Sequence, residues 1–355
     1  MTNTEKLHAL GQSLWLDNIT RELLLSGTLE NYIRKFSITG LTSNPTIFEH
    51  AIDSGDSYDR SIRDKASRGL SGEALFLELA LEDLRQAADL FREAHEATGG
   101  VDGWVSLELS PLLVNDTAAS VKAACQLHAQ ADRPNLFIKI PGTPAGVPAI
   151  EESIFSGVPI NVTLLFSREQ YLAAAHAYMR GIARRIEAGL DPRVTSVASL
   201  FVSRWDVAVK DEVSPSLHNR LGIAVARQTY NAYRDLLSSD RWQRLADAGA
   251  QPQRLLWAST GTKDPAASDT LYLEALAAPD TINTIPEKTL HAFADHGNVG
   301  SVMPIDGGDA EAVLAAFRRE GVDDRALATR LQIEGAESFS ESWRTLLSSV
   351  QRKSF

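Results

Sequence analysis

The sequence has little cysteine and no long hydrophobic run. Cys125 is its only cysteine, so the chain cannot form an internal disulfide, which favours a reducing compartment. No apolar run reaches the length of a membrane-spanning helix. The first residues, MTNTEKLHALGQ, lack the basic and apolar regions of a secretory signal. We therefore expect a cytoplasmic protein that does not act on a membrane.

The sequence also lacks an excess of basic residues. Its 35 Lys and Arg against 46 Asp and Glu give a formal net charge of -11 at pH 7. Nucleic acids and anionic membranes bind basic surfaces, so we expect neither as a partner, whereas a small anionic substrate needs only a local cationic pocket. The sequence has no HExxH, CxxC or paired-histidine spacing. We predict no metal site and no cofactor.

The sequence does contain a repeated alternation of short apolar stretches with longer amphipathic ones. Strands alternating with helices predict a parallel sheet, and eight such units favour a (β/α)8 TIM barrel over a doubly wound sheet. Only helical patterns follow Pro286, so we predict one barrel domain over 1–355 with an appended C-terminal helical segment, 298–355, packed on it. The predicted strands are 13–19, 38–44, 103–109, 135–141, 160–166, 195–202, 254–260 and 280–286.

The sequence patterns of two connecting regions predict helices. The stretch 20–36 has the apolar spacing of one helix face. The region from Thr46 to Gly100 is too long for one connecting helix, and we expect two or three helices there.

Polar residues interrupt these apolar strands near their carboxyl ends. The strands of a parallel barrel are covered on both faces and normally read as apolar runs. Their carboxyl ends form the active-site face in barrel enzymes, and residues two apart on a strand share a face. We expect these side chains to converge over the barrel mouth: Asp17, Asn44, Glu108, Lys139, Asn161, Thr163, Ser199 and Ser259.

Lys139, in the stretch NLFIKIPG, is the most informative of these residues. Burial disfavours a charged ammonium, and a neutral amine is a nucleophile that can attack a ketone to give a carbinolamine and then a Schiff base. The imine is an electron sink that allows a neighbouring carbon–carbon bond to break without a metal. Glu108 and Asp17 are suited to moving the protons that this chemistry needs, and Thr163 can hold a water for Glu108.

Each of these residues also has a structural interpretation. Lys139 can extend to the surface with its stem against the core. Asp17 can cap the helix that begins near Thr20, and Asn44 before Pro45 fits a helix N-cap with proline at the first position. Thr163 is β-branched and suits a strand whatever its chemistry.

Two cationic residues follow the sixth and seventh strands. Arg204 lies in SLFVSRWD, and Lys263 follows Ser259 in WASTGTKD. The loops after the seventh and eighth strands often bind phosphate in this fold. Lys263 is therefore either a phosphate ligand or an exposed loop charge.

Several motifs together resemble a known family. The stretches GLTSNPTIF, VSLELSP, NLFIKIPGTPAGVPAIEE, INVTLLFSREQY and LLWASTGTKDP resemble transaldolase in its longer bacterial form, in the same order, from about Leu14 to Gly297. The resemblance implies a Schiff-base aldolase barrel in the non-oxidative pentose phosphate pathway. Such an enzyme transfers a dihydroxyacetone unit from sedoheptulose 7-phosphate to glyceraldehyde 3-phosphate, giving erythrose 4-phosphate and fructose 6-phosphate. Its partners are sugar phosphates.

The resemblance also implies roles for the residues at the strand ends. Lys139 matches the Schiff-base lysine, and Asp17 matches the acid/base aspartate at the sugar hydroxyl where the bond breaks. Glu108 matches the glutamate that acts through a water, which Thr163 helps to hold. The residues that match substrate-binding positions are Asn44, Asn161, Ser199, Phe201, Arg204 and Ser259.

The sequence departs from the family at two positions. Shorter transaldolases have an arginine just after the serine of the seventh strand, whereas this chain reads Ser-Thr-Gly-Thr-Lys there, with Lys263 as the substitute. Leu200 stands where many relatives have a proline. Lysine is a point charge rather than a planar fork, which changes how a phosphate is held.

Three other functions remain open at this point. The same residues suit a Schiff-base aldolase that releases dihydroxyacetone, and Arg204 and Lys263 suit a non-catalytic barrel that binds sugar phosphates. A glycosidase using Glu108 and Asp17 leaves Lys139 without a purpose. The sequence does not choose between a monomer and a homodimer.

Overall fold

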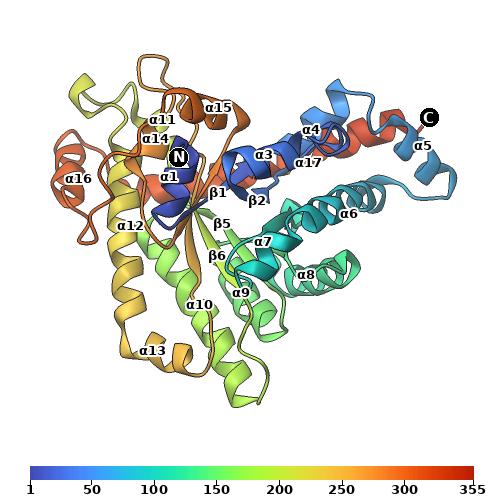
Figure 1. The fold of residues 1–355 in the computed structure, drawn as a ribbon, viewed down its shortest axis with the longest axis horizontal. Helices are drawn as coiled ribbons and strands as arrows, with labels where there is room; N and C mark the ends of the chain where they lie inside the picture. The colour runs from blue at the N-terminus through green and yellow to red at the C-terminus, as the bar shows by residue number, and fades with distance from the viewer.

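The eight strands form a closed parallel barrel in sequence order (Figure 1). The computed structural model describes all residues from 1 to 355. Pairing of β1 with β8 closes the sheet. The barrel confirms the predicted (β/α)8 fold, and each strand overlaps its predicted stretch: β1 (Gln12–Asp17), β2 (Ile38–Thr42), β3 (Trp104–Glu108), β4 (Leu136–Pro141), β5 (Ile160–Leu165), β6 (Ser196–Phe201), β7 (Arg254–Ala258) and β8 (Thr281–Ile285).

Helices surround the barrel. Seventeen α-helices and two short 3-10 helices connect and cover the strands. Their bounds are α1 (Asn3–Ala9), α2 (Arg21–Leu25), α3 (Thr28–Phe36), α4 (Pro45–Ser54), α5 (Asp59–Ser67), α6 (Gly72–Leu90), α7 (Arg92–Ala97), η1 (Pro111–Leu113), α8 (Thr117–Ala131), α9 (Gly146–Phe155), α10 (Arg168–Glu187), α11 (Ser203–Val209), η2 (Pro215–Leu217), α12 (Leu221–Ser238), α13 (Asp240–Asp247), α14 (Leu271–Ala275), α15 (Glu287–His296), α16 (Ala310–Arg319) and α17 (Asp324–Lys353).

The structure corrects two of the predicted helical regions. The stretch 20–36 forms α2 and α3 rather than one helix, because Gly27 between them has a φ of 72° that continues neither helix. The region from Thr46 to Gly100 holds four helices, α4 to α7, so the prediction of two or three was wrong. Gly55 and Gly69 lie in the first two breaks, and Gly69 has a φ of 91°. The break between α6 and α7 lies at Phe91, where nothing in the sequence marks an end.

The barrel interior is filled with aromatic side chains below its polar mouth. Trp104 and Phe137 stack with their ring centroids 4.0 Å apart, and Trp15 lies 6.2 Å from Phe137. Phe137 precedes Lys139 by two residues, so both side chains point to the same face of β4. The space is tight, since a Cβ on Gly40 would lie 2.6 Å from the Trp15 indole.

The last helix runs from the barrel to a set of outer helices. α17 has 30 residues and is capped by the preceding Asp323, whose side chain accepts hydrogen bonds from the backbone N–H groups of Arg325 and Ala326. It contacts α4, α5 and α6 and also touches β5 and α11 at the barrel. Figure 1 shows the C-terminus beside α5, at the far side from α16. No helix in the structure combines the length and apolarity needed to cross a membrane.

Candidate active site

A cavity of about 260 Å³ opens at the carboxyl ends of the strands. Parallel strands in a barrel bring these ends to one rim, so residues far apart in sequence meet there. Nine of the eleven predicted site residues line the cavity: Asp17, Asn44, Lys139, Thr163, Ser199, Phe201, Arg204, Ser259 and Lys263. The other two, Glu108 and Asn161, lie beneath it and are buried.

Lys139 and Glu108 form a buried ion pair. They occupy paired positions on β4 and β3, and Lys139 Nζ lies 2.7 Å from Glu108 Oε2. The ammonium also donates a hydrogen bond of 3.0 Å to the carbonyl oxygen of Ser43. Each residue is only 5% exposed, so the lysine does not extend to the surface.

The pKa of the Glu108 carboxyl is raised above the usual value of a glutamate. Burial raises its pKa, the charge of Asp17 raises it further, and the Lys139 ammonium opposes both. Its Oε2 faces the Lys139 ammonium, and its Oε1 has no hydrogen-bond partner in the chain. Glu108 is therefore a carboxyl that can exchange protons beside the amine.

Asp17 is the second carboxyl of the site. Its Oδ1 accepts a hydrogen bond of 2.8 Å from Thr42 Oγ1. Burial raises its pKa, and the nearby Lys139 ammonium is the largest opposing effect. The alternative helix-capping role is wrong, since the side chain of Thr20 caps α2 by accepting from the N–H of Leu23. The Asp17 carboxyl therefore lines the cavity and is not used to cap a helix.

Thr163 presents a hydroxyl without a hydrogen-bond partner. Its Oγ1 is buried and unpaired within the chain, and the residue lines the cavity. It lies at a β-bulge, because the register between β5 and β6 shifts between Val162 and Leu165. The next residue, Leu164, has a φ of 56°, which is the left-handed region that non-glycine residues rarely adopt. The interpretation of Thr163 as an ordinary residue of a regular strand is therefore incomplete.

The two asparagines differ in their surroundings. Asn44 caps α4, since its Oδ1 accepts from the N–H of Ile47 at 3.1 Å and Pro45 is the first helical residue. It lines the cavity as well, so the capping bond and the cavity position coexist. Asn161 donates to Ser106 Oγ at 3.1 Å and accepts from Ser199 Oγ at 2.7 Å. Its amide is thereby held below the cavity floor.

A cationic end of the cavity is formed by Arg204 and Lys263. The Arg204 guanidinium carbon lies 5.3 Å from the ring centroid of Phe201 and 5.9 Å from that of Phe339. Burial lowers the pKa of Arg204, which the charge of Glu334 opposes. A guanidinium whose face lies over aromatic rings still has N–H groups at its edge that can donate hydrogen bonds to an anion.

Ser259 lies near this cationic end in a strained backbone conformation. Its φ is 55°, and its hydroxyl lies 2.9 Å from that of Ser203, the first residue of α11. Such conformations are kept where the surrounding structure imposes them, often at functional sites.

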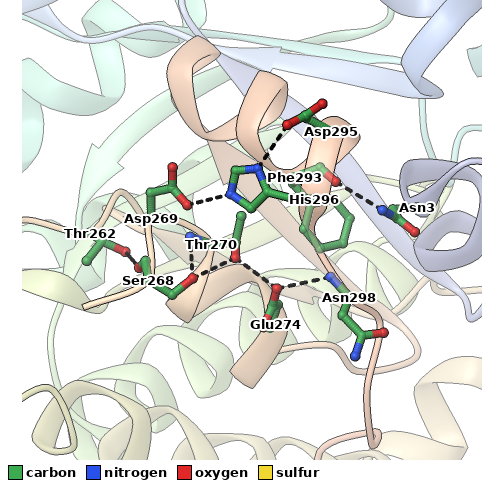
Figure 2. A network of polar contacts seen from close by, with 10 residues as sticks. All are labelled: Asn3, Thr262, Ser268, Asp269, Thr270, Glu274, Phe293, Asp295, His296 and Asn298. Atoms are coloured by element: carbon green, nitrogen blue, oxygen red, sulfur yellow. Dashed lines mark hydrogen bonds and ion pairs between the residues drawn. The ribbon is translucent and has the colours of Figure 1, made fainter. Parts of the chain in front are cut away.

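The loop that carries Lys263 is held by a polar network, which Figure 2 shows from close by. Within the loop, Thr262 Oγ1 donates to the carbonyl oxygen of Ser268 at 2.8 Å. Glu274 in α14 accepts from Thr270 Oγ1 at 2.8 Å, and Asp269 lies 2.9 Å from His296 of α15. The network ties the loop to two helices and so restrains the position of the Lys263 backbone.

The sequence prediction missed several residues that line the cavity. Thr284 lies near the carboxyl end of β8, where the rule applied to the other strands would have found it. Its hydroxyl lies 2.5 Å from that of Thr42. Phe339 comes from α17, and no local pattern connects it with the barrel. The remaining ones are Thr42, Thr46, Ile47, His50, Ala258, Gly261 and Pro286.

Comparison with known proteins gives a consistent result. The family model described as "Transaldolase/Fructose-6-phosphate aldolase" matches residues 14–350. A "Transaldolase" of Parafrankia sp. (strain EAN1pec) is 45% identical, over 98% of this chain and 96% of that protein. "Transaldolase 1" of Streptomyces coelicolor is 44% identical, over 98% and 94%. A "Transaldolase" of Thermobifida fusca is also 44% identical, over 98% and 97%.

Proposed function

The chain belongs to the transaldolase/fructose-6-phosphate aldolase family, and we propose that Lys139 is the residue on which its transaldolase reaction proceeds. The activity is that of a transaldolase, which moves a dihydroxyacetone unit from sedoheptulose 7-phosphate to glyceraldehyde 3-phosphate. The products are erythrose 4-phosphate and fructose 6-phosphate. One observation carries the assignment to Lys139: its Nζ lies at the barrel mouth, 2.7 Å from the buried carboxyl of Glu108.

The first step is formation of the Schiff base. The Lys139 amine attacks the ketone carbon of the donor and gives a carbinolamine, which then loses water to give the imine. Glu108 lies beside Nζ and has a raised pKa, so it can take up and return the protons of these steps, directly or through a water. The unpaired Thr163 hydroxyl can hold that water.

The second step is cleavage of the donor. Asp17 takes the proton of the sugar hydroxyl as the adjacent carbon–carbon bond breaks, and the electron pair of that bond passes to the imine to form an enamine. The aldose leaves, the acceptor aldehyde enters, and the enamine attacks its carbonyl carbon while Asp17 returns the proton to the new hydroxyl. Water then hydrolyses the new imine by the reverse of the first step, which releases the ketose phosphate and restores the Lys139 amine. The position of Asp17 on the cavity wall, with its pKa raised by burial, supports this role.

The phosphate of each sugar is assigned to the cationic end of the cavity. We assign Arg204 as its main ligand, with Ser259 and Lys263 beside it, because all three line the same cavity as Lys139. Asn44, Ser199 and Phe201 would contact the sugar chain. Asn161 would act from below through Ser199, to which it is hydrogen-bonded.

Two broader features belong to the same proposal. We assign residues 298–355 to the barrel domain as an appended helical segment, since Phe339 in α17 lines the same cavity as Lys139. We place the reaction in the cytoplasm, where a chain with one free cysteine needs no disulfide and phosphorylated sugars are available.

Borohydride trapping tests the assignment. The protein is incubated with fructose 6-phosphate, reduced with borohydride, digested and analysed by peptide mass spectrometry. We expect the mass of a reduced dihydroxyacetone adduct on the peptide that contains Lys139. The variant Lys139→Arg, which keeps the charge but not the nucleophilic amine, serves as the control and should give no adduct.

The outcomes separate the alternative functions. An adduct on another lysine, or none, would refute the role of Lys139 and favour a barrel that only binds sugar phosphates. If the adduct forms, adding an acceptor aldehyde before reduction separates transfer from release. With a transferase, adding the aldehyde before reduction lowers the amount of adduct and yields the new ketose phosphate. A releasing aldolase accumulates free dihydroxyacetone even when no acceptor is present.

A further inference from the structure

The backbone beside Thr163 is strained and needs external support. Leu164 has a φ of 56°, in the left-handed region that a residue with a Cβ rarely adopts. The strain lies within the β-bulge of β5, directly after Thr163, which lines the cavity. A bulge re-aims the neighbouring side chain, so whatever holds the bulge also sets the direction of Thr163.

Helix α17 supplies that support through a single side chain. Gln332 donates from Nε2 to the carbonyl oxygen of Leu164 at 2.9 Å and to that of Gly142 at 3.1 Å. Gly142 follows Pro141, the last residue of β4, the strand that carries Lys139. The amide therefore adds a second link between the end of the Lys139 strand and the bulge, beside the backbone hydrogen bond of 2.8 Å from the Gly142 N–H to the Thr163 carbonyl oxygen.

The contact between α17 and the bulge is close and buried. Gln332 is 7% exposed, so its two hydrogen bonds are shielded from water. A Cβ on Gly335, one turn further along α17, would lie 3.0 Å from Leu164 Cδ2 and 3.1 Å from Arg204 Nη1. Gly335 thus lets the helix approach the bulge while leaving room for the guanidinium. A larger residue there would push α17, and with it Gln332, away.

We propose that Gln332 is a positioning residue for the reaction. Its carboxamide holds the β5 bulge against the end of β4 and thereby sets the position of the Thr163 hydroxyl relative to the Lys139 amine. The proposal rests on the proposed role of Thr163 and adds a residue from the C-terminal helix to it. Gln332 itself touches neither the substrate nor the reacting atoms.

A double-mutant cycle tests the proposal. The variants are Gln332→Met, Thr163→Ala and the two combined, with kcat and KM measured for transfer from fructose 6-phosphate to erythrose 4-phosphate. Since a small misplacement of a reacting group can reduce a rate up to a hundredfold, we expect Gln332→Met to lower kcat by about ten- to a hundredfold with little change in KM. In the Thr163→Ala background, Gln332→Met should have little further effect, because the group it positions is gone.

The control is the same substitution elsewhere on α17. Gln351→Met replaces an exposed glutamine near the end of the helix and should leave kcat unchanged. Thermal unfolding of each variant confirms that activity is measured on folded protein. If Gln332→Met does not fold, Gln332→Asn replaces it in the cycle, because its amide is one methylene too short to reach both carbonyl oxygens.

The cycle can also overturn the proposal. If Gln332→Met lowers kcat by the same factor with and without the Thr163 hydroxyl, or does not lower it, Gln332 does not act through Thr163. The same holds if Thr163→Ala alone is fully active. Trapping of the Lys139 adduct in the wild-type protein is a separate result, so failure of the Gln332 proposal is distinguishable from failure of the proposed function.

Discussion

Lys139 Nζ and Glu108 Oε2 lie 2.7 Å apart at paired positions of two adjacent strands, both buried at the mouth of the barrel. The pairing puts a proton-exchanging carboxyl within reach of the amine that we assign as the nucleophile. Burial raises the pKa of Glu108 and the Lys139 ammonium opposes that rise, so replacing Lys139 with a neutral residue should raise the pKa of Glu108 further.

The first prediction concerns Glu108→Gln. The glutamine keeps the shape of the side chain and removes its proton exchange, which contributes about 10²–10⁴-fold in general acid–base catalysis. We expect kcat for transfer to fall within that range while KM changes little, measured by steady-state kinetics. Glu337→Gln, an exposed change on α17, should be fully active. Retention of kcat in Glu108→Gln would show that the proton passes by another route.

The second prediction concerns the pH dependence of Schiff-base formation. Because the pKa of Glu108 is raised above its ordinary value of 4.5, the rate should fall on the acid side at a higher pH than an ordinary glutamate would give. The charge of Asp17 contributes to that rise, so Asp17→Asn should move the acid limb to lower pH. The readout is the rate of borohydride-trapped adduct formation from dihydroxyacetone, which requires no bond cleavage by Asp17. An unmoved limb would refute the coupling.

The third prediction concerns Arg204→Lys. A lysine keeps the charge but loses the planar fork and the stacking between Phe201 and Phe339. A hydrogen bond to a charged group is worth about 1.5–3 kcal/mol, so we expect KM for fructose 6-phosphate to rise by at least about tenfold. Adduct formation from dihydroxyacetone, which has no phosphate, should be unaffected. An equal loss with both substrates would argue against a phosphate role, and the exposed Arg344→Lys is the control.

The fourth prediction concerns Asp206, a buried carboxyl of α11. It accepts hydrogen bonds from the Tyr272 hydroxyl and from the Leu221 N–H, both at 2.8 Å, and burial raises its pKa from 3.8 to about 6. Between these values the folded state binds more protons than the unfolded state. The stability contributed by the protonated group is therefore complete below pH 3.8 and is lost as the pH rises through about 6.

The measurement for Asp206 is the free energy of unfolding by urea between pH 4 and 7. Relative to Asp206→Asn, the wild-type protein should lose about 2 kcal/mol over that range, since one pKa unit corresponds to about 1.4 kcal/mol and part of the titration lies outside it. The exposed Asp211→Asn should follow the wild-type curve. Parallel curves for wild type and Asp206→Asn would mean that Asp206 is ionised throughout.

The fifth prediction concerns packing in the barrel. Gly40 lies opposite Trp15 in the β1–β2 register, and a Cβ there would be 2.6 Å from the indole. Gly40→Ala should lower the free energy of unfolding by about 1–3 kcal/mol, the usual range for overpacking. Gly300→Ala, where no atom lies within 4 Å of an added Cβ, should be nearly neutral. Equal stability of the two variants would mean that the indole moves aside freely.

The sequence alone placed most of the site. Polar residues at the ends of apolar strands identified six residues that line one cavity, because a barrel brings all strand ends to one rim. Arg204 and Lys263 were found as cations that follow two of the strands, and Phe201 from the family resemblance alone. It did not reveal that Asn161 lies beneath the cavity, bonded to Ser106 and Ser199, since that depends on its depth in the barrel. It also did not reveal that the side chain of Asn44 caps α4 from the cavity wall.

What the sequence determined by itself is the local part of this protein: the type, order and facing of its strands, and the chemistry at their ends. Those properties follow from periodicity and composition over a few residues. The tertiary structure alone decided the contacts between distant segments. Phe339 reaches Arg204, and Gln332 reaches the bulge at Leu164, because α17 packs back on the barrel. Such contacts depend on how the whole chain closes, and no spacing within one segment encodes them.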